Sequence, residues 1–200
     1  MRFDEIKDKI KDIKLIGKGW RGRVYRGIYE GKDLAFKVAS DPQFIPNIQK
    51  EGKILKIVNR EGIGGRLFLT GEDFIAYDFI EGKPLNEVIN EKNGKVIISK
   101  LLKQARVLDK LGINKEELHR PYKNVLADKK INVYLIDFER ARMGKNIQNV
   151  NQFLQYILNE GYRYLPPFDK AKLIELAKEY KKNKTEENFK KILGLLGIKD

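Results

Sequence analysis

The sequence predicts an α+β fold in which the first 80 residues are rich in strands and the rest are mostly helical. Short runs rich in β-branched and aromatic residues lie within residues 14–39 and 65–80. After residue 85, apolar residues recur mainly at helical spacing. A break containing Gly82 and Pro84 separates the two parts. We therefore expect one domain made of two lobes, residues 1–80 and 81–200, joined by a short hinge.

The first part is expected to combine two helices with several strands. Phe3, Ile6, Ile10 and Ile13 recur at helical spacing and predict an amphipathic helix over residues 2–14. Two β-rich runs around residues 30–33 predict a hairpin. The remaining elements expected here are a helix over 46–60 and strands within 65–71 and 73–80.

The second part is expected to be helical with one exception. Residues 124–138, NVLADKKINVYLIDF, are two apolar runs about a polar turn and predict a hairpin. Apolar periodicity predicts the helices, which we expect over residues 85–111, 147–159, 169–182 and 185–196.

Composition excludes several kinds of site. The 200 residues include no cysteine and one histidine, which excludes disulfides, thiolate metal sites, cysteine nucleophiles and His-rich metal sites. No apolar run reaches the ~18 residues of a membrane span, and the charged start of the chain is unlike a signal peptide. We therefore expect a cytoplasmic protein with no membrane association.

The net charge of +13 has two interpretations. Lysine-rich surfaces with many glutamate partners are common in heat-adapted proteins, where the charges are solvated. The excess of positive charge would also attract RNA, an acidic protein or nucleotides. The sequence leaves both interpretations open.

A glycine-rich stretch, GKGWRGRV, covers residues 17–24 and spaces Gly17, Gly19 and Gly22 as G-x-G-x-x-G. In a dinucleotide-binding fold the third glycine would open a helix, but here a strand pattern continues. The stretch therefore fits either a hairpin folded over nucleotide phosphates, where glycines let the backbone approach the oxygens, or an ordinary turn.

Two charged residues lie where apolar ones are expected. Lys37 is flanked by Ala35, Phe36 and Val38 in a predicted strand, and Glu51 lies on the apolar face of the predicted helix 46–60. Burial of an unpaired charge is costly, so the two residues are natural partners. The alternatives are a lysine that extends to solvent and a glutamate at the edge of the apolar stripe.

Residues 117–140 contain two oxygen-bearing candidates for metal binding. Asn124 opens the predicted hairpin, and Asp137 follows 13 residues later at the end of an apolar run. Amide and carboxylate oxygens that converge on one point suit Mg²⁺ held together with ligand phosphates. Taken singly, each residue is equally compatible with a turn or cap.

The ordered set of glycines, strand Lys, helical Glu, Asn and Asp-Phe resembles the protein-kinase-like fold over residues 15–160. The short chain looks most like small atypical archaeal kinases, the RIO kinases and the kinase subunit of the tRNA-modifying KEOPS complex. It looks closest to short archaeal proteins predicted to be serine/threonine kinases.

This resemblance implies a two-lobed fold with a β-rich N-lobe and a small α-helical C-lobe. It implies ATP and Mg²⁺ (or Mn²⁺) as cofactors and transfer of the γ-phosphate to a protein substrate, the chain itself included. Lys37 and Glu51 would form a pair, and Asn124 and Asp137 would hold the metal. The implied ATP-binding residues are Gly17, Gly19, Gly22, Val24, Ala35, Lys37, Asp78 and Ile80.

The sequence departs from the family pattern around the expected catalytic base. The family places an aspartate five residues before its metal-binding asparagine, and here that position is His119. Matching the letters HR instead puts Pro121 at the base position. A histidine can orient a hydroxyl or act as a general base, contact phosphate, or be structural. Glu139 replaces the family's flexible glycine and is a further candidate metal ligand, and no A-P-E motif follows.

These departures leave two rivals to a serine/threonine protein kinase. One is an ATPase or small-molecule phosphotransferase with the same ATP site, which the short segment after Glu139 favours. The other is a nucleotide-holding scaffold that docks on RNA or a protein partner, which the net charge favours.

Overall fold

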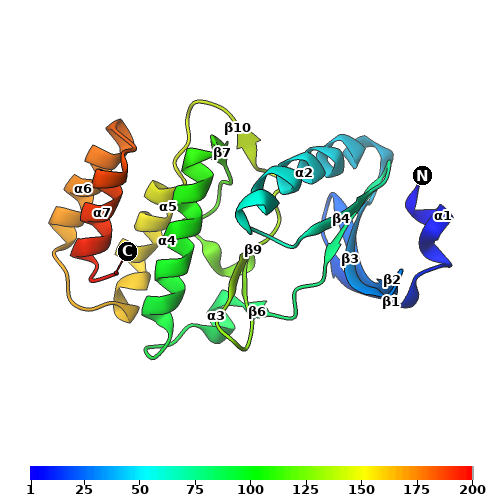
Figure 1. The fold of residues 1–200 in the computed structure, drawn as a ribbon, viewed down its shortest axis with the longest axis horizontal. Coiled ribbons are helices and arrows are strands. Elements are labelled where there is room, and N and C mark those ends of the chain that lie inside the picture. The colour runs from blue at the N-terminus through cyan, green and yellow to red at the C-terminus, as the bar shows by residue number, and fades with distance from the viewer. Residues whose placement is uncertain (200) are drawn as a thin grey trace. The chain divides into compact units, whose positions relative to one another are not determined.

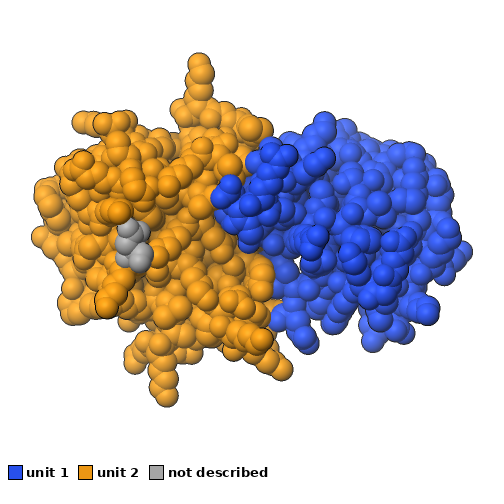
Figure 2. Space-filling model, in the orientation of Figure 1, with its two compact units in different colours: residues 1–81, 136–140 blue, residues 82–135, 141–200 orange. Residues whose placement is uncertain are grey.

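The computed structural model describes residues 1–199, which divide into two compact units. Unit 1 comprises residues 1–81 and 136–140, and unit 2 comprises residues 82–135 and the chain after residue 140 (Figure 2). Every strand pairing in the described part of the chain is antiparallel. The protein therefore mixes helices with antiparallel sheets, as the sequence predicts.

Unit 1 is built on a five-stranded sheet with the order β1-β2-β3-β5-β4. Its hairpin between β2 and β3 turns at Glu30 and Gly31, which both have positive φ (51° and 76°). Two such residues in a two-residue loop match the twist of the flanking strands. The elements are α1 (Phe3–Lys7), β1 (Lys11–Lys18), β2 (Gly22–Tyr29), β3 (Lys32–Ala39), α2 (Ile45–Val58), β4 (Leu67–Thr70) and β5 (Phe74–Asp78).

Alternating side chains of the sheet pack against a different helix on each face. On one face, the Phe3 ring of α1 lies 5.8 Å from the Phe36 ring and 5.7 Å from the Phe74 ring. On the other face lies α2, whose Gly52 approaches so closely that an added Cβ would lie 2.9 Å from Ile75. Because side chains alternate along a strand, Lys37, next to Phe36 on β3, points to the α2 face.

The predicted helix over residues 2–14 was wrong in its second half. The helix ends at Lys7, and β1 begins at Lys11 and pairs with β2. Pairing with a neighbouring strand outweighs the local helical spacing of apolar residues. Ile10 and Ile13 still pack against the same core as Phe3. The apolar pattern therefore predicted correctly which residues face the core, but it predicted the wrong secondary structure for them.

Unit 2 is mainly helical, and α5 packs against both α4 and α6 (Figure 1). The side chains of Asp169 and Thr185 cap the first turns of α6 and α7, which explains where these helices begin. Two small sheets, β6-β8-β9 and β7-β10, complete the unit. Its elements are β6 (Lys83–Pro84), α3 (Leu85–Val88), α4 (Gly94–Lys110), β7 (Ile113–Asn114), β8 (Val125–Ala127), β9 (Val133–Leu135), β10 (Arg142–Met143), α5 (Asn149–Asn159), α6 (Lys170–Lys182) and α7 (Glu186–Leu195).

The single helix predicted over residues 85–111 is two helices. A turn between Val88 and Gly94 separates them, and the Asn90 and Asn93 side chains bond to backbone groups within it. Asparagine side chains that compete for backbone hydrogen bonds favour turns over helices. No helix among residues 1–199 has the length and apolar character needed to cross a lipid bilayer.

A buried polar network joins the helices of unit 2. Asp109 on α4 accepts hydrogen bonds from the backbone and side-chain amides of Asn149 on α5 (2.9 and 2.8 Å) and from the Tyr180 hydroxyl on α6 (2.9 Å). Asn149 also donates to the Ile113 carbonyl (2.7 Å) and accepts from the Lys115 amide (2.8 Å). Asn149 is completely buried, so the loss of its side chain would remove hydrogen bonds from several buried polar groups.

We expect Asn149→Ala to lower the free energy of unfolding by about 3 kcal/mol, because it removes the buried hydrogen bonds that the Asn149 side chain makes with Asp109, the Ile113 carbonyl and the Lys115 amide. Equilibrium urea denaturation measures the change. Asn159→Ala, at an exposed position of the same helix, is the matched control and should cost no more than about 0.5 kcal/mol. Equal losses in the two variants would contradict the network's role.

Candidate functional site

The Lys37 side chain of β3 lies among three carboxylates of unit 1. Its Nζ is 2.7 Å from Glu51 Oε2 on α2, 2.9 Å from Asp137 Oδ1 and 3.4 Å from Glu139 Oε2. Lys37 and Glu51 are both buried. The lysine therefore does not extend to solvent, and residues far apart in the sequence meet at one ammonium group.

The two buried members of this cluster have shifted pKa values. Burial alone would lower the pKa of Lys37, but the carboxylates of Glu51 and Asp137 outweigh burial and raise it. Burial raises the pKa of Glu51 above its ordinary value of 4.5, although the positive charge of Lys37 acts in the opposite direction. Glu51 Oε1 also accepts the backbone N–H of Phe138 (3.0 Å), which fixes the segment that carries Asp137.

The glycine-rich stretch forms the hairpin between β1 and β2. The Gly19 amide donates to the Gly22 carbonyl (2.8 Å) and closes the turn. None of Gly17, Gly19 and Gly22 has a positive φ, so backbone conformation does not require glycine at these positions. At Gly22 an added Cβ would lie 3.1 Å from the Val38 carbonyl oxygen and 3.7 Å from Lys37 Cε. Gly22 therefore allows close packing beside the lysine.

An ion pair that the sequence did not indicate joins this hairpin to the acidic segment. Arg21 Nη1 is 2.6 Å from Glu139 Oε1. The two residues are 118 positions apart, and Arg21 lies in a turn where many basic residues are solvated. No local pattern pointed to the pairing. Glu139 thus contacts both Arg21 and Lys37.

Three of the other predicted ATP-binding residues lie on strands of the same sheet, and the fourth follows one of them. Val24 pairs with Lys37 in the β2–β3 register, and Ala35 is buried on β3. Asp78 ends β5, and its amide donates to the Arg66 carbonyl. Ile80 follows two residues later and is half-buried. Their contact with ATP stays a prediction.

Three carboxylates of unit 1 have the donor chemistry of a Mg²⁺ site. One oxygen each from Glu51, Asp137 and Glu139 lies within 4.8 Å of the others, and hard oxygen ligands suit this ion. All three carboxylates contact Lys37, but Glu51 is buried and also accepts the Phe138 amide. The Asp137 side chain is 51% exposed, and its backbone φ is 59°. Of the three, Asp137 is therefore the most accessible to a metal ion.

The predicted residues of unit 2 lie on one loop before β8. Asn124 is buried, and its Nδ2 donates to Glu117 Oε2 at 3.1 Å. His119 is half-buried, and its side chain makes no hydrogen bond or ion pair within residues 1–199. Glu117 was missed because its spacing from Asn124 is seven residues, not the five that the family pattern requires.

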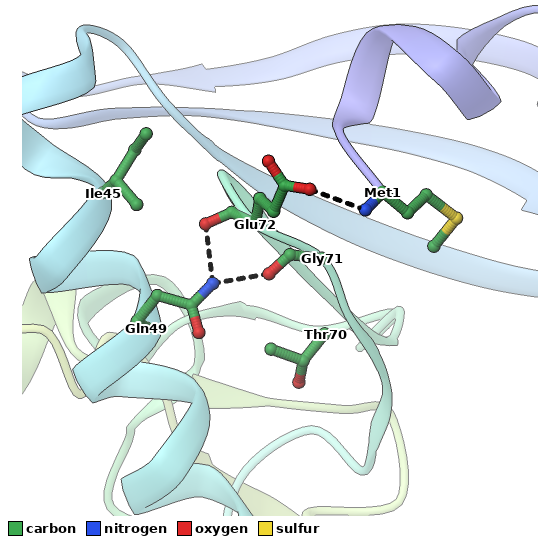
Figure 3. Close-up of a pocket in the computed structure, with 6 residues that line it drawn as sticks. All are labelled: Met1, Ile45, Gln49, Thr70, Gly71 and Glu72. Carbon is green, nitrogen blue, oxygen red and sulfur yellow. Dashed lines mark hydrogen bonds and ion pairs between the residues drawn. The ribbon is translucent and has the colours of Figure 1, made fainter.

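A separate hollow of unit 1 contains none of the predicted site residues (Figure 3). The Gln49 side chain donates to the Gly71 and Glu72 carbonyls, and the Met1 amino group pairs with Glu72 (2.9 Å). The residues that line the hollow are Met1, Ile45, Gln49, Thr70, Gly71 and Glu72. The Gln49 bonds join α2 to the turn between β4 and β5, and the Met1 pair joins the start of the chain to the same turn.

Comparison with known proteins finds distant similarity to protein kinases. The chain is 26% identical over 148 residues to "Putative serine/threonine-protein kinase YrzF" of Bacillus subtilis, covering 72% of this chain and 66% of that protein. It is 31% identical over 146 residues to "RasGEF domain-containing serine/threonine-protein kinase X" of Dictyostelium discoideum, covering 65% and 15%. These similarities support a protein-kinase-like family.

A plant protein gives the same indication. The chain is 28% identical over 170 residues to "Probable L-type lectin-domain containing receptor kinase VII.2" of Arabidopsis thaliana, covering 76% of this chain and 25% of that protein. The matched region is thus a quarter of the plant protein and about two thirds of the Bacillus protein. No family model matches the chain. The antiparallel sheet and helices are consistent with a kinase-like fold.

The carboxylate cluster predicts a pH-dependent defect in Lys37→Met. Without the ammonium group, the pKa of buried Glu51 rises further above 4.5. A carboxyl group with a raised folded-state pKa favours folding below its unfolded pKa, and this contribution is lost as pH rises through the folded pKa. We therefore expect the loss of unfolding free energy to be on the order of 3 kcal/mol at pH 7 and smaller at pH 5, measured by urea denaturation.

The double variant Lys37→Met/Glu51→Gln is the control for this experiment. It removes both buried charges, so the difference between its stabilities at pH 5 and pH 7 should be close to that of the parent protein. A Lys37→Met defect of equal size at both pH values would show that Glu51 does not depend on the Lys37 charge.

Proposed function

We propose that the protein is an ATP- and Mg²⁺-dependent phosphotransferase that transfers the γ-phosphate of ATP to a serine or threonine hydroxyl of a protein. The observation that supports this most is the buried Lys37, charged and surrounded by Glu51, Asp137 and Glu139. The named kinases among its relatives support the same reaction class. Hydroxyls of the chain itself are among the candidate acceptors.

Each residue of the cluster has a physical role in this proposal. Phosphoryl transfer passes through a loose transition state, so positioning and charge neutralisation provide most of the rate enhancement. Lys37 neutralises phosphate oxygens while Glu51 fixes the direction of its side chain. Asp137 binds the metal ion, and Asn124 supplies an amide oxygen to it. The hairpin with Gly17, Gly19 and Gly22 covers the phosphates.

We propose an atypical kinase related to the compact archaeal group, with an N-lobe over residues 1–80 and a C-lobe over 81–200. Val24, Ala35, Asp78 and Ile80 contact the nucleoside. On the acceptor side, His119 lies five residues before Asn124 and is the candidate that the family spacing favours to face the hydroxyl.

A second candidate function is ATP hydrolysis, with water as the acceptor. The segment between Glu139 and α5 favours it, because residues 140–148 contain only the two-residue strand β10. So short a segment offers little backbone with which to bind an acceptor peptide. The same Lys37 and Asp137 would serve both reactions.

Asp137→Asn tests the metal assignment, because it removes the charge at a position where asparagine tolerates the positive φ. We expect Mg²⁺-dependent ATP consumption to fall about 100-fold or more, measured as ADP formed per protein. Asp12→Asn is the matched control, since Asp12 is exposed and also has a positive φ (53°). Undiminished ATP consumption by Asp137→Asn would remove Asp137 from the metal site.

A further inference from the structure

A carboxylate lies beside the asparagine that the proposed function assigns to the metal. Glu117 Oε2 accepts a hydrogen bond from Asn124 Nδ2 at 3.1 Å, across seven positions of sequence. This bond also orients the Asn124 amide. Because Nδ2 donates its hydrogen bond to Glu117, the Asn124 atom that remains for a cation is Oδ1. This oxygen accepts no hydrogen bond from residues 1–199. The contact therefore couples the two side chains.

The backbone at this position is strained. Glu116 and Glu117 have φ values of 63° and 59°, and they are consecutive residues with a side chain in the left-handed region. Each such residue is disfavoured, and strain of this kind concentrates at functional sites. The left-handed pair bends the loop and brings a residue seven positions from Asn124 to within hydrogen-bond distance of it.

Side chains of helix α5 bond to the loop both before and after the two strained residues. The amide of Lys115, two residues before Glu117, donates to Asn149 Oδ1 at 2.8 Å. The amide of Leu118 donates to Gln152 Oε1 at 3.2 Å, and the Leu118 side chain is buried. The Glu117 carbonyl accepts the Arg120 amide at 2.9 Å. The structure thus fixes the Glu117 backbone in a conformation that no local preference favours.

We propose that Glu117, and not His119, is the group that receives the proton of the acceptor hydroxyl. This rests on the proposed function. The hydroxyl oxygen forms a bond to the γ-phosphorus as the bond between that phosphorus and the β,γ-bridging oxygen breaks. The hydroxyl proton passes to the Glu117 carboxylate, and ADP leaves with the bridging oxygen and the electron pair of the broken bond.

Two features distinguish Glu117 from its neighbours. No described residue fixes the His119 ring, whereas Asn124 fixes the Glu117 carboxylate. Glu116 has the same backbone conformation as Glu117, but its carboxylate pairs with Arg142 Nη2 at 2.9 Å. The contact with Asn124 is therefore specific to one of two adjacent glutamates, which makes Glu116 a matched control.

Glu117→Gln is the decisive variant, because it keeps an oxygen for the Asn124 amide but cannot take up a proton at neutral pH. We expect kcat for ATP consumption, with either a hydroxyl or water as acceptor, to fall about 100-fold. The KM for ATP should stay within twofold of the parent value. The midpoint of urea denaturation should equal that of the parent protein within error. Glu117→Asp should recover part of the lost kcat, whereas Glu116→Gln should behave like the parent protein.

The outcomes separate this assignment from the proposed function. If the parent protein consumes ATP and Glu117→Gln does so equally fast, Glu117 is not the proton acceptor while the phosphotransferase proposal stands. If His119→Ala loses more kcat than Glu117→Gln at unchanged ATP affinity, the role belongs to His119. If the parent protein consumes no ATP with Mg²⁺ present, the proposed function fails and the assignment of Glu117 fails with it.

Discussion

The arrangement of strand β3, helix α2 and the acidic segment in unit 1 depends on the contacts of the buried Lys37 ammonium group. This group bonds to Glu51 on α2 and to Asp137 and Glu139 on the segment 136–140. The strand, the helix and the acidic segment are thereby held to one point. Burial of an ion pair in place of apolar residues often gives no gain in stability. The stability of unit 1 therefore does not by itself explain why charged residues, and not apolar ones, occupy these buried positions.

Unit 2 depends on a comparable polar centre at Asn149. Its side chain satisfies Asp109 on α4 and the Ile113 carbonyl, and it also accepts the Lys115 amide. One buried residue therefore connects the packing of the helices to the loop that carries Glu117 and Asn124. The loop keeps its strained backbone conformation because its amides are hydrogen-bonded to side chains of the packed helix α5.

The cluster around Lys37 in unit 1 could be predicted in part from the sequence. A lysine in an apolar strand and a glutamate on an apolar helix face predict a pair, because each charge needs a partner when buried. The structure shows Lys37 and Glu51 in contact, while their catalytic roles stay predictions. The Arg21–Glu139 ion pair was not predictable, because it joins an ordinary basic turn residue to a residue 118 positions away.

For the fold, too, the local sequence predicts some elements well and others poorly. The helices after residue 147 lie close to the ranges that apolar spacing predicts, since their periodic pattern is local, as are the side-chain caps of α6 and α7. The helix at the start of the chain was predicted too long because its second half pairs with β2. Glu117 escaped notice for a related reason. Its approach to Asn124 depends on two left-handed residues, and neither is a glycine or asparagine that would indicate such a turn.

The most direct test of the account follows the γ-phosphate of labelled ATP incubated with purified protein and Mg²⁺. Gel electrophoresis detects label on protein, and thin-layer chromatography separates ATP from free phosphate. We expect label on serine or threonine of the protein. Label recovered as free phosphate would favour hydrolysis as the reaction of the same site. Label that stays in ATP, although Mg²⁺ and ATP together raise the protein's melting temperature, would contradict the assignment of this site to phosphoryl transfer.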